Sequence, residues 1–222
     1  TYTFTPNSTE CAVSVPMTVV VKMVPVAIAT PSSQTICSGE YSSIVLKSTV
    51  SNATTFNWTV VSTGATGATP GSGNIISQIL TATGTAVGNV KYSVTPTLNG
   101  CSGIPITVNI SVSPLPTATA TPRVTICSGS STAIGLTSDV AGSTFSWNAV
   151  QTNVTGATAG SGDTIAQTLT TVGTKSGEAV YSVIPTANGC PGLPILVTVT
   201  VHPIPVLSVN PLTSSLCSGS TT

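Results

Sequence analysis

Six cysteines are the residues of this sequence with the clearest capacity for chemistry. Three of them open Cys-Ser-Gly triplets at intervals of 90 residues, namely Cys37, Cys127 and Cys217. The other three are separated by 90 and then 89 residues, namely Cys11, Cys101 and Cys190. The chain has no Cys-x-x-Cys and a single His, so it cannot complete a tetrahedral zinc site in each copy. We therefore expect disulfides made in an oxidising compartment and no metal, with reduced, buried thiols as the alternative.

Three pairing patterns agree with this spacing. The first closes each copy on itself, as Cys37–Cys101 and Cys127–Cys190. The second joins neighbouring cysteines along the chain, as Cys11–Cys37, Cys101–Cys127 and Cys190–Cys217. The third connects one copy to the next through Cys37–Cys190. A choice between them requires the strands that carry the cysteines.

A catalytic centre is not expected from the remaining reactive residues. The single histidine, His202, would need Asp139 or Asp163 beside it to form a Ser-His-Asp arrangement, and neither acid lies in a recognisable motif. The acidic residues do not recur at equivalent positions, so paired carboxylates for glycoside hydrolysis are not expected either. Residues 71–73 and 160–162 are glycine-rich, but no lysine or helix follows, and we interpret them as loops. The sequence predicts neither an enzyme nor a cofactor.

The composition excludes several classes of partner. Five Lys and Arg and five Asp and Glu make up 5% of the 222 residues, against about 25% in an average soluble domain. Such few, scattered cations cannot neutralise nucleic-acid phosphates or bind an anionic membrane. No apolar run reaches the roughly 18 residues of a membrane helix. With 41 Thr and 30 Ser, the surface must consist of hydroxyl groups rather than ions.

The cysteine spacing belongs to a repeat that runs through the chain. Ile44 and Leu46 recur 90 residues later as Ile134 and Leu136, and from Asn52 onward the offset is 89, because one residue has been lost. A Pro-x-Pro cannot continue a central strand, so we place boundaries at Pro25 and at the two Pro-x-Pro sequences. The predicted parts are residues 1–24 (the last two strands of an earlier copy), 25–114 and 115–203 (complete copies) and 204–222 (the start of a later copy).

Alternating apolar and hydroxyl residues predict strands in every copy. Residues 106–112 and 196–201 place β-branched apolar side chains on one face and mostly polar ones on the other. Short strands in a unit of about 90 residues indicate an all-β fold of tandem immunoglobulin-like sandwiches arranged end to end. In the second copy we expect seven strands, at residues 116–120, 123–126, 133–138, 144–150, 164–171, 179–185 and 194–201. Asn99-Gly100 and Asn188-Gly189 predict hairpin turns.

This arrangement favours the third pairing pattern. Cys37 follows the second expected strand, whereas Cys101 lies at the tip before the last strand, so they fall at opposite poles of one sandwich, roughly 30 Å apart. A disulfide needs Cα atoms within about 7 Å. We therefore predict Cys37–Cys190, a bond between domains that would make the array a stiff rod, and keep the self-closed pattern as an alternative. Cys11, Cys101, Cys127 and Cys217 would then pair with neighbouring repeats.

Six aromatic residues are predicted to anchor the cores, because each Phe-x-Trp places both rings on one face of a strand. They are Phe56, Trp58, Tyr92, Phe145, Trp147 and Tyr181. A sugar-stacking platform formed by Trp58 and Trp147 is the alternative interpretation. Exposed tryptophans would favour binding, and buried ones would favour a structural role.

The chain resembles the PKD-like, immunoglobulin-type repeats of large Bacteroidota surface proteins that the type IX system secretes. The resemblance is carried by the Ile-Cys-Ser-Gly opening, the Phe-x-Trp, the Tyr-Ser-Val, the Asn-Gly-Cys tip and the closing Pro-x-Pro. It implies an extracellular location and a role in adhesion or in a surface filament. Thr164, in Asp-Thr-Ile, resembles the Bacteroidota O-glycosylation signal.

These observations predict a structural repeat that acts as a stiff, protease-resistant spacer. Its partners are expected to be neighbouring repeats of the same protein, which assemble into a fibre or array because few charges block the edge strands. The alternative is a carbohydrate-binding module that recognises surface glycans. Nucleic-acid binding and membrane insertion are not expected.

Overall fold

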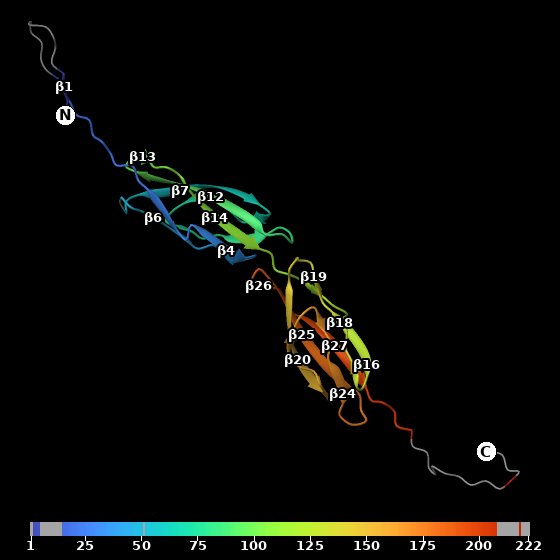
Figure 1. Ribbon diagram of the computed structural model, residues 1–222. Helices are drawn as coiled ribbons and strands as arrows, with labels where there is room; N and C mark the ends of the chain where they lie inside the picture. Colours follow the sequence, from blue (N-terminus) through green and yellow to red (C-terminus); the bar gives the residue numbers. More distant parts are fainter. Residues whose placement is uncertain (1, 5–14, 51, 208–217, 219–222) are drawn as a thin grey trace, which may run out of the picture. The chain divides into compact units, whose positions relative to one another are not determined.

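The computed structural model describes residues 2–4, 15–50, 52–207 and 218 (Figure 1). Over these residues the secondary structure consists of β-strands and turns, without a helix. The contacts divide the chain into two units, Thr1–Pro114 and Leu115–Thr222, and each contains one complete copy of the repeat. Before the first copy, β1 (Tyr2–Phe4) pairs antiparallel with β2 (Val15–Met17).

One layer of unit 1 is a sheet with the strand order β4-β14-β12-β7-β9, and β13 also pairs with β12. Its strands are β4 (Ser33–Cys37), β7 (Thr55–Thr63), β9 (Gly71–Ser72), β12 (Gly88–Leu98), β13 (Cys101–Ser102) and β14 (Ile106–Ser113). The pair β4 and β14 is parallel, whereas the other pairs are antiparallel.

The second layer of unit 1 contains two three-stranded pieces, β10-β6-β3 and β5-β11-β8. The strands are β3 (Ala27–Thr30), β5 (Glu40–Tyr41), β6 (Ile44–Ser48), β8 (Ala65–Thr66), β10 (Ile75–Ile76) and β11 (Ile79–Ala82). The opening strand therefore changes sheet: β3 pairs with β6 in one layer and β4 pairs with β14 in the other. Two layers joined in this way form an immunoglobulin-like sandwich.

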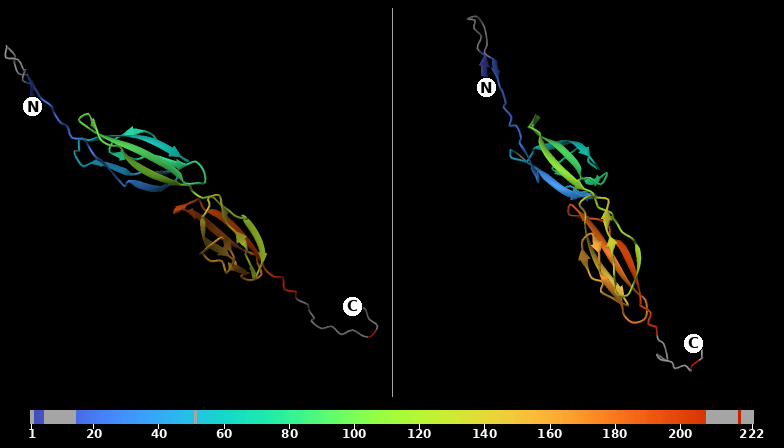
Figure 2. Two further views of the ribbon diagram at one scale, coloured as in Figure 1. Left: turned by 45° about the horizontal axis from the view of Figure 1, so that its top comes forward. Right: turned by 45° about the vertical axis from the view of Figure 1, so that its right-hand side comes forward.

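Unit 2 repeats this topology with the sheet β16-β27-β25-β20-β22, to which β26 is added, opposite the pieces β15-β19, β17-β24-β21 and β18-β23. The first sheet contains β16 (Arg123–Cys127), β20 (Thr144–Thr152), β22 (Gly160–Ser161), β25 (Gly177–Ala187), β26 (Cys190–Pro191) and β27 (Ile195–His202). The other layer contains β15 (Ala118–Thr119), β17 (Ser130–Ser131), β18 (Ile134–Gly135), β19 (Thr137–Ser138), β21 (Val154–Thr155), β23 (Thr164–Ile165) and β24 (Thr168–Thr171). The two layers of strands are visible within each unit in both views of Figure 2.

The all-β, tandem-sandwich prediction is confirmed, but two expected strands of unit 2 are each divided in two. The strand expected at 133–138 is β18 and β19, and Gly135 stands where unit 1 has Val45. The strand expected at 164–171 is β23 and β24, because the backbone N–H of Gln167 donates to the Thr132 hydroxyl at 2.9 Å rather than to a carbonyl of a neighbouring strand. Glycine weakens a strand interior, and a side-chain acceptor interrupts a ladder.

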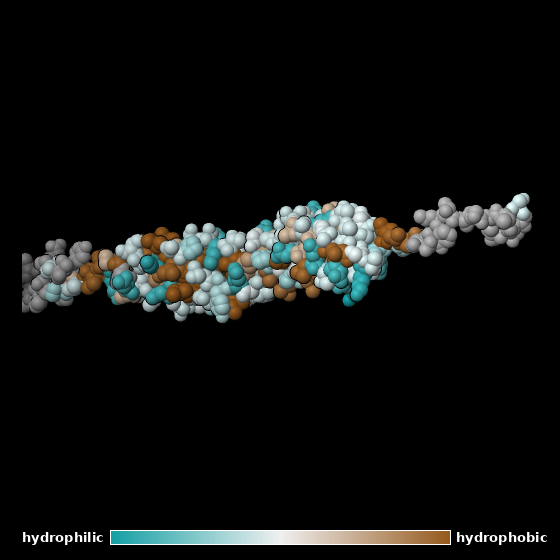
Figure 3. All heavy atoms as spheres, turned by 90° about the horizontal axis from the view of Figure 1, so that it is seen from below, coloured by the Kyte–Doolittle hydropathy of each residue, from teal (hydrophilic) through white to brown (hydrophobic). Residues whose placement is uncertain are grey.

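Each unit has its own hydrophobic core, formed by the inward faces of its two layers. The longest strand of unit 1, β12, alternates between fully buried positions such as Val90 and Tyr92 and more exposed ones such as Lys91. The outward positions carry mostly Thr, Ser and Asn, and the face in Figure 3 is largely pale with scattered apolar residues. The core is therefore assembled from alternation along a few long strands, as the sequence pattern predicts.

The two Asn-Gly turns form as predicted. Asn99 and Gly100 both have positive φ angles, 50° and 82°, and connect β12 to β13. Asn188 and Gly189 repeat this geometry between β25 and β26, with φ angles of 51° and 80°. Two consecutive residues with positive φ give the hairpin turn whose twist matches that of the strands.

Candidate functional site

The tryptophans lie in the cores, and the glycine-rich stretches pack against them. Trp58 is 7% exposed, and its Nε1–H donates to the carbonyl oxygen of Thr69 at 3.2 Å. Gly71 lies against the indole, so that a Cβ added there would stand 2.8 Å from Cζ2 of Trp58. The interpretation of residues 71–73 as a loop is therefore wrong: Gly71 and Ser72 form β9, where glycine leaves room for the ring.

Trp147 of unit 2 has the same packing but a different hydrogen-bonding state. It is 6% exposed, and a Cβ added at Gly160 would stand 2.8 Å from its Cζ2. Its Nε1–H is buried and has no hydrogen-bond partner within the part of the chain described. The loop interpretation of residues 160–162 is also wrong, because Gly160 and Ser161 form β22. Neither indole offers the exposed face that a sugar-stacking platform needs.

The other four predicted core anchors are also buried. Phe56 and Phe145 are 3% and 5% exposed, and Tyr92 and Tyr181 are both fully buried. Burial raises the pKa of the Tyr92 hydroxyl to about 12 and also raises the pKa of Tyr181, because the charged phenolate is poorly solvated.

A glutamine in each unit connects the buried tyrosine to the opposite layer, a feature that the sequence analysis missed. In unit 1 the hydroxyl of Tyr92 donates to Oε1 of Gln78 at 2.7 Å. The same oxygen accepts from the backbone N–H of Thr69 at 2.9 Å, and Nε2 of Gln78 donates to the Thr69 carbonyl and hydroxyl, both at 2.9 Å. The backbone N–H of Gln78 donates to the hydroxyl of Ser42 at 3.0 Å.

Unit 2 repeats this Tyr–Gln cluster almost atom for atom. Tyr181 donates to Gln167 at 2.9 Å, Gln167 binds Thr158 through both amide atoms, and Thr132 replaces Ser42. The recurrence of glutamine at an offset of 89 residues was a signal that could have identified the cluster from the sequence. A partly buried polar cluster with several hydrogen bonds between the two layers fixes the register of the strands around it.

The Cys-Ser-Gly motif is a turn that connects both layers of a unit. The backbone N–H of Ser38 donates to the Ser113 carbonyl in β14 at 2.8 Å, and its hydroxyl accepts from Ala82 N–H at 3.0 Å. Gly39 has a φ of +90° and donates to the Leu80 carbonyl at 2.8 Å. The motif of unit 2 makes equivalent bonds, whereas the motif at Cys217 lies outside the described residues. The turn thus holds the preceding cysteine in a defined place.

The cysteines are in two different states. Cys37 and Cys190 are disulfide-bonded, which confirms the prediction of a disulfide, and the pairing of Cys37 with Cys190 stays a prediction. Cys101 and Cys127 are free thiols, so the alternatives of self-closed copies and of a Cys101–Cys127 bond are wrong. Cys11 and Cys217 lie outside the described residues.

The strand register gives the physical reason that unit 1 does not close on itself. Cys37 lies opposite Ser113, at the end of β14, and Ile106, at the start of the same strand, lies opposite Val94. Cys101 lies opposite Leu98, beyond the Ile106 end. The two sulfurs are therefore separated by the length of an eight-residue strand, roughly 26 Å at the usual rise.

The histidine has a hydrogen-bond partner that the sequence did not suggest. The hydroxyl of Ser176 lies 2.8 Å from Nδ1 of His202 in an exposed position. Asp139 is bound elsewhere, since its Oδ1 accepts from the backbone N–H of Thr117 at 2.7 Å, a bond that lowers its pKa. Asp163 lies in the turn before β23, where its carbonyl accepts from Leu136 N–H at 2.9 Å. The structure does not bring the three parts of a triad together.

Thr164, the candidate for O-glycosylation, is exposed on β23 opposite Gly135. The described residues contain no group of three or more His, Cys, Asp or Glu that could hold a metal ion. They also contain no helix long and apolar enough to cross a membrane.

The family model for the PKD-like domain matches residues 34–116 and 124–205, one match in each unit. These matches cover most of the chain. The chain belongs to the PKD-like domain family. No curated protein matches it.

Solved structures of immunoglobulin domains are also similar. Sidekick-1 immunoglobulin domains 1–4 align with a TM-score of 0.37 and 10% identity, over 84% of this chain and 48% of that one. The complex of Dpr2 Ig1–Ig2 with DIP-Theta Ig1–Ig3 aligns with a TM-score of 0.33 and 12% identity, over 77% of this chain and 63% of that one. This chain thus spans less than two thirds of either.

Proposed function

We propose that this PKD-like chain is a structural repeat segment of an extracellular adhesin or surface filament, in which it acts as a stiff, protease-resistant spacer. The observation that carries the proposal is the oxidised state of Cys37 and Cys190, one from each unit, while Cys101 and Cys127 remain free. A bond between consecutive repeats restricts bending at the linker that Pro114 and Pro116 already hold extended.

The same rule extends to further copies. Cys127 occupies the position of Cys37, and Cys101 occupies the position of Cys190, at offsets of 90 and 89 residues. In an array, Cys127 would bond to the hairpin tip of a following repeat, and Cys101 to the turn of a preceding one. Each free thiol is then one half of a bond between repeats, and the complete cores within each unit explain why no bond is needed inside one.

Surface chemistry supports a location outside the cell. Disulfides persist in oxidising compartments, and only five Lys and Arg offer cleavage sites for trypsin-like proteases. The resemblance to type IX-secreted Bacteroidota repeats supports the cell surface, and the exposed Thr164 supports O-glycosylation there. Scarce charge on the strand edges favours assembly with neighbouring repeats.

Negative-stain microscopy of the oxidised chain, compared with the Cys37→Ser variant, tests this function. We expect short rods of uniform length from the oxidised chain and a broad distribution of bend angles from the variant. Rods of equal straightness in both samples would contradict the role of the disulfide. Isolated globules in the oxidised sample would contradict the spacer itself.

A further inference from the structure

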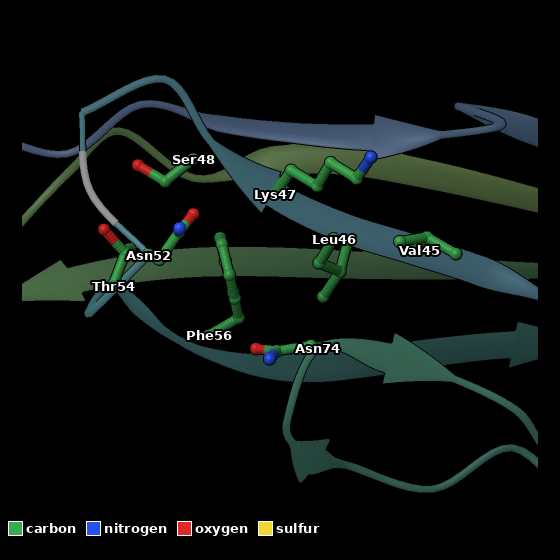
Figure 4. Close-up of a pocket in the computed structure, with 8 residues that line it drawn as sticks. All are labelled: Val45, Leu46, Lys47, Ser48, Asn52, Thr54, Phe56 and Asn74. Atoms are coloured by element: carbon green, nitrogen blue, oxygen red, sulfur yellow. The ribbon is translucent and has the colours of Figure 1, made fainter.

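A hollow in unit 1 combines polar side chains with an unsatisfied hydroxyl. It has a volume of about 440 Å³, which is within the range of small-molecule sites. Its lining is drawn in Figure 4 and comes from β6, from the connection to β7, from β7 itself and from the turn before β10: Val45, Leu46, Lys47, Ser48, Asn52, Thr54, Phe56 and Asn74. Four of these residues also line an adjoining hollow of about 620 Å³, namely Asn52, Thr54, Phe56 and Asn74.

The hydroxyl of Thr54 is the feature that the fold leaves unexplained. Thr54 is 4% exposed, and its Oγ1 has no hydrogen-bond partner among the described residues. A buried hydroxyl without a partner is unfavourable, so native proteins retain few of them. An external partner that enters the hollow would satisfy it.

In unit 2 the hydroxyl at the same position finds its partners within the chain. Ser143 stands where unit 1 has Thr54, and its hydroxyl donates to the Val140 carbonyl at 2.7 Å and approaches the Ser138 hydroxyl at 3.1 Å. The connection before it is one residue shorter than in unit 1. The extra residue of unit 1 therefore coincides with the loss of the internal partner and with the hollow.

The side chains around Thr54 define the chemistry of a ligand. In Figure 4 the hydroxyls of Ser48 and Thr54 gather at one end with the carboxamide of Asn52, and Asn74 lies beside Phe56. The ammonium group of Lys47 points away from this end. The carboxamides of Asn52 and Asn74 are exposed and make no hydrogen bond within the described part of the chain. Amides and hydroxyls that both donate and accept suit an uncharged, hydroxylated ligand.

We propose that this hollow binds one neutral pyranose unit of a polysaccharide. Asn52, Thr54 and Asn74 would hydrogen-bond the sugar hydroxyls, and the edge of Phe56 with Leu46 would contact a C–H face of the ring. Because both apolar side chains are nearly buried, the apolar contact is small, and a single unit binds weakly, with a dissociation constant of about 1 mM. Weak single sites gain strength when repeats are arrayed on one polymer.

An amide-detected NMR titration of the oxidised 222-residue chain tests the proposal. The probes are the methyl glycosides of glucose, galactose, mannose and N-acetylglucosamine, with glycerol as a non-ring polyol. We expect saturable shifts from at least one glycoside at residues 46–56 and 74, and none from glycerol. Absence of saturable shifts, shifts centred elsewhere, or equal shifts with glycerol would overturn the proposal.

Thr54→Val and Ser143→Ala form a matched pair of variants. Thr54→Val removes a hydroxyl that makes no internal bond, so we expect an unchanged fold and about tenfold weaker sugar binding. Ser143→Ala removes a satisfied hydroxyl, so unit 2 should lose stability while sugar binding is retained. Unchanged binding in Thr54→Val would overturn the proposal, and it would leave the role as a structural spacer untouched.

Discussion

The two units share one fold, but they differ in which of their buried polar atoms are hydrogen-bonded. Both contain the Tyr–Gln cluster, the Cys-Ser-Gly turn and a tryptophan packed on glycine. Within the described part of the chain, the Trp58 indole has a hydrogen-bond acceptor and the Trp147 indole has none, whereas the Ser143 hydroxyl is satisfied and the Thr54 hydroxyl is not. The recurring contacts therefore specify the sandwich. The units differ in which buried polar atom lacks a hydrogen bond, and that difference should change the stability of each unit by a small amount.

The largest loss of stability should come from replacing one closely packed glycine, and it should be similar in both units. Gly156 has a φ of +101°, and a Cβ added there would stand 2.1 Å from the Thr168 carbonyl oxygen, so Gly156→Ala should destabilise unit 2 by more than about 3 kcal/mol. Gly129 has a φ of +82° but open space around it, so Gly129→Ala should cost only about 1 kcal/mol. Chemical denaturation of each variant measures both.

Gly67→Ala and Gly39→Ala are the equivalent pair in unit 1. A Cβ at Gly67 would stand 2.0 Å from the Ile79 carbonyl, and Gly39 again has no atom within 4 Å. If both variants of either pair lost similar amounts of stability, the close approach of a carbonyl oxygen would not be the reason that glycine is required.

Replacing the core tryptophan should destabilise the two units by different amounts. Trp58→Phe and Trp147→Phe remove similar buried surface, but among the described residues only the former removes a hydrogen bond. We expect unit 1 to lose about 1 kcal/mol more than unit 2, as judged by the two unfolding transitions. Equal losses would mean that water satisfies Trp147.

Alkaline pH should weaken unit 1 through Tyr92. Its pKa is about 12 in the folded chain and about 10 when unfolded, so the unfolded state releases its proton first. The stabilising contribution is complete below pH 10 and is lost progressively as the pH rises toward about 12.

Denaturant midpoints measured across this range, with the free thiols alkylated, should fall more steeply in the native chain than in Tyr92→Phe. An identical pH dependence in the two proteins would contradict the assignment. Tyr181→Phe is the matched variant for unit 2, where the pKa is raised for the same reason.

The smallest expected effect is an acid dependence of stability that should occur in unit 2 alone. The Thr117 N–H holds the pKa of Asp139 below its ordinary value, and Thr49 stands at this position in unit 1. The stability that ionised Asp139 contributes to unit 2 is present above the ordinary pKa of a carboxyl group. It is lost as the pH falls through the lowered pKa of Asp139 in the folded chain. On acidification the unit 2 transition should shift slightly in the native chain, and that shift should be absent from Asp139→Asn.

Local patterns predicted the parts of this fold that depend on local chemistry. Alternation located the long strands β14 and β27, and Asn-Gly located the turns, because each signal lies within a few consecutive residues. The place of Gly71 beneath Trp58 and the role of Gln78 depend on strands that meet only in the folded unit. Comparison of the copies could have found Gln78, whereas the Thr54 hollow required coordinates.

The central claim is that the disulfide connects consecutive repeats rather than closing one. Peptide mapping without reduction, after alkylation of free thiols and cleavage by a protease of broad specificity, tests it most directly. We predict one cross-linked species that contains Cys37 and Cys190, together with alkylated Cys101 and Cys127. A species that joins Cys37 to Cys101, or Cys127 to Cys190, would contradict the account.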